Sequence, residues 1–287
     1  MSLKATNASR KDAALGAETR AAWDEIAPGY DKTNTPMQMW LGNEGLRRAG
    51  LRSGMRFLDV AAGSGALGIP AARLGAQVLA VDQSPVMLEL LRERARKEGL
   101  DIETRVMDGH ALDLEDDSFD MAGSQFGVML FPDMPKGIGE MARVVMPGGR
   151  VLMSVYGDPG KIEFLGFLVH AVQAVRPGFA GRPMDPPPLP FQLQSPERLR
   201  KELAAAGLKD IKVETITETT AFVTGAALWE WLVSSNPIVE SVLGSLDLTS
   251  GERRTIQQRL DQMVQERAGR AAAAELTNPI NIGVGTV

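Results

Sequence analysis

Short apolar runs alternate with amphipathic stretches through the first half of the chain. The apolar runs, which have the pattern of buried strands, cover residues 55–60, 77–81, 102–106, 119–125 and 150–156. The stretches between them place apolar residues at helical spacing and cover residues 66–74, 86–98 and 136–145. Strands that alternate with helices in this way predict a parallel sheet with helices on both faces.

The residues before this segment have a different pattern. Residues 1–13 are polar and small, so we expect them to be loosely held. A helical pattern follows and should end near Pro28 and Gly29, because proline and glycine break helices. A second short helix is expected over residues 37–49.

The residues after the segment predict further helices and two more strands. The helices are expected at 162–175, 196–206, 225–235 and 251–273, with a proline-dense loop at 181–190. The strands are expected at 211–217 and at 280–284, the latter as a last strand at the edge of the sheet.

Composition and charge exclude several classes of function. The net charge of −5 argues against a general nucleic-acid binder, whose surface would be basic. With no cysteine and only His110 and His170, thiolate and histidine-rich metal sites are excluded, and no metal is expected. No apolar run approaches the roughly 20 residues that span a bilayer, and the first residues lack a signal-peptide core. We therefore expect a cytoplasmic protein without a membrane span.

A glycine-rich loop follows the first predicted strand. Gly63, Gly65 and Gly68 match the spacing of a dinucleotide fingerprint, and Asp82 at the end of the second strand could bind a ribose diol. This interpretation, which would indicate a nicotinamide-dependent oxidoreductase, leaves Asp59 unexplained. A carboxylate just before the loop would repel a pyrophosphate.

A ligand without phosphate and with a cationic amino group fits the loop better. S-adenosylmethionine is such a ligand: Asp59 could order the loop or favour its amino acid end, and Asp82 could bind its ribose. Asp108 after the third strand could accept a hydrogen bond from the adenine, with Met87 and Met107 beside the ring. These acidic residues all follow parallel strands, at the sheet edge where such folds bind ligands.

The same residues carry a family resemblance. Asp59–Gly65 resembles motif I of class I methyltransferases, with alanines where that family often has glycines. Asp82–Ser84, Asp108–Leu112 and Met141–Arg150 are similar to later motifs of the family, and Trp23–Asp31 resembles the start of its ubiquinone/menaquinone branch. The match covers roughly residues 20–157.

The resemblance implies an α/β fold with a seven-stranded, Rossmann-like sheet, mostly parallel, whose last strand is antiparallel. It also implies S-adenosylmethionine as the methyl donor and a small-molecule acceptor, quinone-like, phenolic or another metabolite. The methylated atom could be carbon, nitrogen or oxygen. The residues expected to bind the donor are Tyr30, Asp59, Ala61, Gly63, Gly65, Asp82, Gln83, Met87, Asp108, Gly109, His110 and Gln125.

Methyl transfer from a sulfonium is an in-line displacement, so alignment of the two reactants is the main requirement. A base is needed only if the acceptor must lose a proton. The candidates for positioning or proton transfer are Gln125, His110, His170 and Tyr156. A protein that binds S-adenosylmethionine without catalysis remains an alternative, as does the oxidoreductase.

The predicted organisation has three parts. Residues 1–50 form a helical lid, and residues 51–157 form the core that binds S-adenosylmethionine. Residues 158–287 complete the core, with insertions at 176–195 and 222–270 that add a helical cap over the acceptor. The expected partner is the small-molecule acceptor, and the sequence is compatible with a homodimer.

Overall fold

A seven-stranded sheet forms the centre of the computed structural model, which describes residues 2–235, 239 and 243–287. The strand order is β3-β2-β1-β4-β5-β7-β6. The strands are β1 (Arg56–Val60), β2 (Gln77–Asp82), β3 (Ile102–Val106), β4 (Phe119–Gln125), β5 (Val145–Tyr156), β6 (Lys209–Phe222) and β7 (Ala274–Thr286).

The pairing of the strands confirms the predicted fold. The pairs within β3-β2-β1-β4-β5 are parallel, whereas β7 runs antiparallel to both β5 and β6. The expected edge position of the last strand was wrong, because β7 lies between two neighbours and β6 forms the edge. Both strands are also longer than predicted, at 14 and 13 residues.

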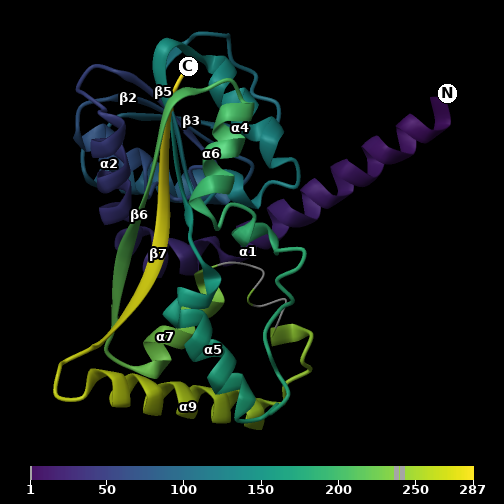
Figure 1. Cartoon of the computed structure of the whole chain (residues 1–287), viewed down its shortest axis with the longest axis vertical. Coiled ribbons are helices and arrows are strands. Elements are labelled where there is room, and N and C mark those ends of the chain that lie inside the picture. The colour runs from purple at the N-terminus through teal and green to yellow at the C-terminus, as the bar shows by residue number, and fades with distance from the viewer. Residues whose placement is uncertain (1, 236–238, 240–242) are drawn as a thin grey trace.

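Helices cover both faces of the sheet (Figure 1). On one face α2 (Gly68–Arg73) and α3 (Pro85–Lys97) contact α1 (Ser2–Ala49), and on the other α4 (Met134–Val144) contacts α6 (Pro196–Ala205). The start of α3 follows from its sequence: Ser84 Oγ accepts a hydrogen bond from the Met87 amide at 3.0 Å, and proline occupies the first helical position.

The long helix α1 corrects two expectations. It is continuous from Ser2 to Ala49, so residues 2–13 are helical and the predicted break at Pro28 is absent. An interior proline costs a helix about 3 kcal/mol, and tertiary contacts offset this cost. Thr33 Oγ1 lies 2.9 Å from Ser234 Oγ on a neighbouring helix, and the side-chain amide of Asn34 donates to the same oxygen at 3.2 Å. Figure 1 shows the N-terminal end of α1 projecting away from the body.

A second hydrophobic cluster lies below the sheet (Figure 1). It joins α5 (Glu163–Gln173), α7 (Gly225–Ser235) and α9 (Ser250–Ala268) to the far ends of β6 and β7. The helix α9 ends at Ala268, earlier than expected, because Gly269 adopts a φ of +58° and β7 begins at Ala274. Three short 3-10 helices connect the larger elements: Val128–Leu130, Pro159–Lys161 and Leu189–Phe191. None of the helices in the described ranges combines the length and apolarity that crossing a bilayer requires.

Candidate active site

A cavity of about 540 Å³ opens at the carboxyl ends of the first four strands. Nine of the twelve predicted donor-binding residues line it: Ala61, Gly63, Asp82, Gln83, Met87, Asp108, Gly109, His110 and Gln125. A larger groove of about 1010 Å³ lies at the amino ends of β1, β2 and β4 and contains none of them. The smaller cavity is therefore where the predicted chemistry converges.

Asp82 is held in place by two backbone amides. Its Oδ2 accepts a hydrogen bond from the Gly63 amide, and its Oδ1 accepts one from the Ser84 amide, both at 2.8 Å. Burial raises the pKa of Asp82, and these amide bonds oppose that rise. Each carboxylate oxygen retains acceptor capacity, so the anchored group can still receive two ligand hydroxyls.

The loop between β1 and α2 has an unusual backbone. Gly63 adopts a φ of +54°, and the non-glycine Ala61 adopts +56°. Phe126, directly after β4, is also left-handed at +58°, and both it and Ala61 line the cavity. Left-handed non-glycine residues are strained and concentrate at functional sites.

Asp108, His110 and Phe131 form one wall of the cavity. His110 Nδ1 lies 2.8 Å from Asp108 Oδ1, and the imidazole stacks on Phe131 with ring centroids 4.3 Å apart. Burial would raise the pKa of Asp108, but its bonds with His110 outweigh burial and hold that pKa below its usual value. The histidine is therefore tied to this wall, on the side predicted for the adenine.

The other three residues predicted to bind the donor, Tyr30, Asp59 and Gly65, are not part of the cavity lining in the described part of the chain. Asp59 is 1% exposed beneath Gly68, and burial raises its pKa to about 8. Gly65 packs against the side chains of Ile69 and Leu91. The ring of Tyr30 lies over Gly63, and its hydroxyl donates to Gln38 Oε1 at 2.9 Å. Direct contact of these three with a ligand stays a prediction.

The helix α1 covers part of the cavity. Thr19 and Trp23 line it, and Asp24 Oδ1 accepts a hydrogen bond from Ser84 Oγ at 2.5 Å. Trp23 and Asp24 both belong to the motif at residues 23–31, but the sequence did not predict that Trp23 lines the cavity or that Asp24 bonds to Ser84. The helical pattern alone does not show which neighbour a helix covers.

The four catalytic candidates lie in different places. Gln125 lines the cavity and donates through Nε2 to the Gln38 carbonyl at 3.1 Å, and His110 is on the wall described above. Tyr156 lies one layer behind, stacked on Phe126 with centroids 4.5 Å apart. His170 is exposed on α5 with Nδ1 bonded to the Gly166 carbonyl, outside the lining of the described cavity.

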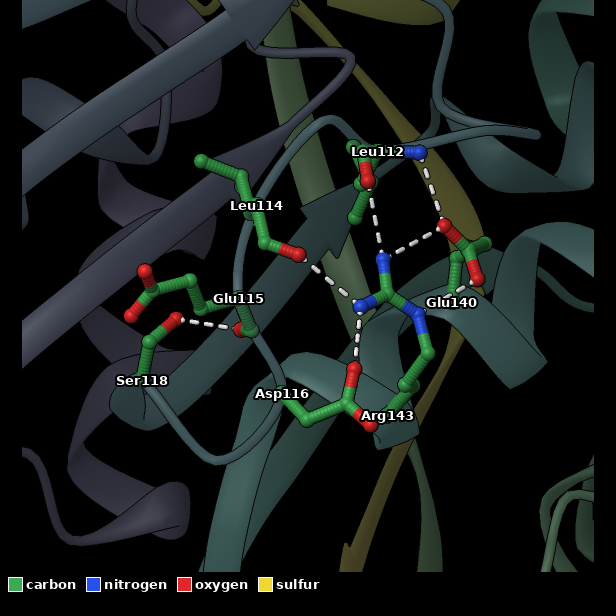
Figure 2. Close-up of polar contacts among 7 residues, drawn as sticks. All are labelled: Leu112, Leu114, Glu115, Asp116, Ser118, Glu140 and Arg143. Atoms are coloured by element: carbon green, nitrogen blue, oxygen red, sulfur yellow. Dashed lines mark hydrogen bonds and ion pairs between the residues drawn. The ribbon is translucent and has the colours of Figure 1, made fainter.

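Arg143 holds the segment that follows the Asp108 wall, and the sequence analysis did not identify it. Its guanidinium donates to the carbonyls of Leu112 at 2.8 Å and Leu114 at 2.9 Å, and it pairs with Asp116 and Glu140 (Figure 2). Glu140 in turn accepts a bond from the Leu112 amide at 2.7 Å. The charge pairs raise the pKa of Arg143, so the clamp stays charged.

Comparison with known proteins identifies the family. The methyltransferase domain model matches residues 58–153. The demethylmenaquinone methyltransferase of Thermus thermophilus is 33% identical over 210 residues, which cover 68% of this chain and 94% of that protein. This chain belongs to the menaquinone-type branch of the class I methyltransferases.

Other relatives agree with that assignment. Uncharacterized proteins of Mycobacterium tuberculosis and Mycobacterium bovis are 35% identical over 170 residues, 58% of this chain, and the matched part spans only 60% of their length. A putative methyltransferase of Bacillus halodurans shares the fold, with a TM-score of 0.55, 15% identity and coverage of 85% and 96% of the two chains. The family predicted from the motifs is thus confirmed.

The methyltransferase cavity has the features that S-adenosylmethionine requires. Asp82 offers two oriented oxygens for a ribose diol. Gly63 leaves open space where a side chain would stand, since a methyl group added there would meet only Tyr30, at 4.0 Å. Met87, Met107 and Phe131 add apolar surface. The residues present therefore fit this methyl donor.

Proposed function

We propose that the protein transfers the methyl group of S-adenosylmethionine to a small-molecule acceptor by in-line displacement. One observation carries this proposal: the glycine loop, Asp82, Asp108 and Gln125 come from four different strand ends and meet at one cavity. The bound donor would supply a methyl group activated by a sulfonium. The chain would supply binding, alignment and exclusion of water.

Each group of cavity residues has a separate role in the proposed site. Asp82 would bind the ribose hydroxyls, and Asp108 with the His110–Phe131 wall would hold the adenine. Gln125, the last residue of β4, and Phe126, which follows it, would face the reacting end of the donor, where an aromatic face favours a cation. The helix α1 would act as a lid, because it contributes Thr19 and Trp23 to the cavity.

The acceptor is proposed as a quinone-like or phenolic ring. Two considerations support this class. Relatives in the comparison are demethylmenaquinone methyltransferases. In this chain, Phe126 of the donor cavity stacks on Tyr156, and Tyr156 meets Phe164 in an edge contact. The cytoplasm remains the proposed location.

The experiment is a calorimetric titration with S-adenosylmethionine, S-adenosylhomocysteine and NADH. We expect the two sulfur ligands to bind and NADH not to bind. The Asp82→Asn variant should weaken binding about 10–100-fold, because hydrogen bonds to a charged acceptor contribute about 1.5–3 kcal/mol each. Asp101→Asn, an exposed aspartate outside the cavity, is the control. Binding of NADH alone would contradict the proposal and favour an oxidoreductase.

A further inference from the structure

A layer of buried polar groups lies between α1, α7 and the sheet, beside the proposed donor site. Five side-chain atoms in it are buried without a hydrogen-bond partner among the described residues: Asn34 Oδ1, Gln125 Oε1, Ser154 Oγ, Trp231 Nε1 and Asn278 Oδ1. Buried polar atoms are nearly always paired, and an unpaired one is costly. A ligand that reaches this layer would supply the missing bonds. We refer to these five residues as the buried polar layer.

Contacts between the elements join these groups into one region. Gln125 and Ser154 are register partners on β4 and β5. Asn34 bonds to Ser234, which in turn bonds to the Trp231 carbonyl. Trp231 packs on Phe164, and Phe164 packs on Tyr156.

Glu218 is the acidic group of this region. It is 8% exposed and accepts a hydrogen bond from Asn278 Nδ2 at 3.3 Å, across the β6–β7 pair. It occupies an inward position of β6, on the same face as Ile216 and Thr220. Burial raises its pKa to about 7, and the bond from Asn278 opposes that rise.

Tyrosines on two other elements are subject to the negative charge of Glu218. Burial raises the pKa of Tyr156 on β5, and the negative charge of Glu218 adds to the rise. Burial also raises the pKa of Tyr30 on α1, which feels the charges of both Asp82 and Glu218. The charge of Asp82 in the cavity and that of the buried Glu218 therefore both act on Tyr30.

The region adjoins the donor cavity directly. Gln125 belongs both to the cavity lining and to the buried polar layer. Phe126 lines the cavity with one side and stacks on Tyr156 with the other. An acceptor in the buried polar layer would thus present its ring beside the strand end where the methyl group is delivered.

We propose that the buried polar layer binds the acceptor as a hydroxylated aromatic ring and that Glu218 takes the proton of its hydroxyl. This inference rests on the proposed methyltransferase function. In the step, the hydroxyl O–H bond breaks and its proton goes to the Glu218 carboxylate. The deprotonated oxygen then forms a bond to the methyl carbon, and the carbon–sulfur bond of the donor breaks with its electron pair kept by sulfur.

The test uses two naphthalene probes that differ only at the hydroxyl. Calorimetry at about pH 8, where Glu218 is ionised, compares 2-naphthol with 2-methoxynaphthalene, which has no proton to donate. Wild type should bind 2-naphthol at least about tenfold more tightly. Glu218→Gln should reduce that ratio about tenfold, because a neutral amide replaces a charged acceptor. Glu214→Gln, at an exposed position four residues earlier on the same strand where the carboxylate pairs with Arg48, should leave the ratio unchanged.

Titration of each variant with S-adenosylhomocysteine separates the two proposals. Its affinity should be the same in wild type, Glu218→Gln and Glu214→Gln, which also shows that the variants fold. Equal affinity of wild type for the two probes, binding of neither probe, or an unchanged ratio in Glu218→Gln would each overturn the role of Glu218. A wild-type protein that fails to bind S-adenosylhomocysteine would instead overturn the donor site.

Discussion

Gln125 and Ser154 lie opposite each other on β4 and β5, and each has a buried oxygen without a hydrogen-bond partner in the described part of the chain. Such an atom costs about 1–3 kcal/mol of stability. The pair adjoins the cavity, since Gln125 is part of its lining. These unpaired oxygens therefore lower the stability of the protein at the place where a ligand would bind.

The first prediction concerns Ser154. Replacing it with alanine removes a buried hydroxyl that makes no bond, so the free energy of unfolding should rise by about 1 kcal/mol. Urea denaturation measures this change. The control is Ser124→Ala, since Ser124 is equally buried but accepts a bond from the Val128 amide at 3.0 Å. The free energy of unfolding of Ser124→Ala should fall by about 1 kcal/mol. An equal fall in both variants would contradict the prediction.

The second prediction concerns the Arg143 clamp. Arg143→Lys keeps the charge but cannot bond the Leu112 and Leu114 carbonyls together with Asp116. The free energy of unfolding should fall by about 1–3 kcal/mol. Affinity for S-adenosylhomocysteine should fall as well, because the clamped segment follows the Asp108 wall.

Arg92→Lys provides the matched control for the clamp. Arg92 pairs with Glu89 on the exposed surface of α3, and its replacement should change stability by less than about 0.5 kcal/mol. Equal thermal stability and equal ligand affinity in the two lysine variants would show that the clamp has no special role.

The third prediction is a pH dependence of stability that arises from Asp59. Burial raises its folded-state pKa from 3.8 to about 8, so the folded protein binds more protons than the unfolded chain between these values. The free energy of unfolding should therefore fall as the pH rises through this window. Glu218 contributes in the same direction, up to about pH 7.

Asp59→Asn should remove its share of that slope. Urea denaturation at about pH 5 and about pH 8 compares the variant with wild type, and the variant should be the more stable of the two at the higher pH. A slope that is identical in both proteins would mean that the Asp59 carboxylate is stabilised by interactions other than those seen in the structure.

The fourth prediction concerns the close approach of two strand ends. A methyl group at Gly127 would lie 2.5 Å from Ala61 Cβ and 2.9 Å from Ser124 Oγ. Gly127→Ala should thus displace the cavity loop, lower stability by about 1–3 kcal/mol and weaken binding of S-adenosylhomocysteine. Gly139→Ala on α4 has open space and should be neutral or stabilising. Unchanged ligand affinity in Gly127→Ala would contradict this view of the loop.

The fifth prediction is that the second hydrophobic cluster, which contains α5, α7 and α9, can be destabilised without loss of ligand binding at the donor cavity. The Gly225 amide donates to Asp261 Oδ1 at 2.6 Å, and a methyl group at Gly225 would overlap the α9 backbone at Asp261. Gly225→Ala should lower the melting temperature while S-adenosylhomocysteine binding below that temperature persists. Gly251→Ala has ordinary contacts and should match wild type. Loss of ligand binding in Gly225→Ala alone would show that the two regions are coupled.

Local and periodic patterns predicted much of this structure. The first five strands follow from their apolar runs, and the convergence of Asp82 and Asp108 follows because the carboxyl ends of parallel strands share one edge. The start of α3 at Ser84 and Pro85 is likewise a local feature.

The remaining features depend on partners that are distant in sequence. Pro28 should end a helix locally, but the contacts of α1 with α7 and the sheet outweigh that preference. Arg143 acts through carbonyl groups about thirty residues away. Glu218 could have been found only as a glutamate at an inward position of an alternating strand, and the predicted strand stopped one residue before it.

The place of β7 has a consequence for the order in which the fold can form. This strand follows both of its neighbours in the sequence, yet it lies between them and pairs with each. During synthesis, β5 and β6 therefore emerge before β7, and the strand edges that pair with β7 in the fold are unpaired until β7 has been made. Until β7 has been made, these edges can pair with other chains, and such pairing is a route to aggregation.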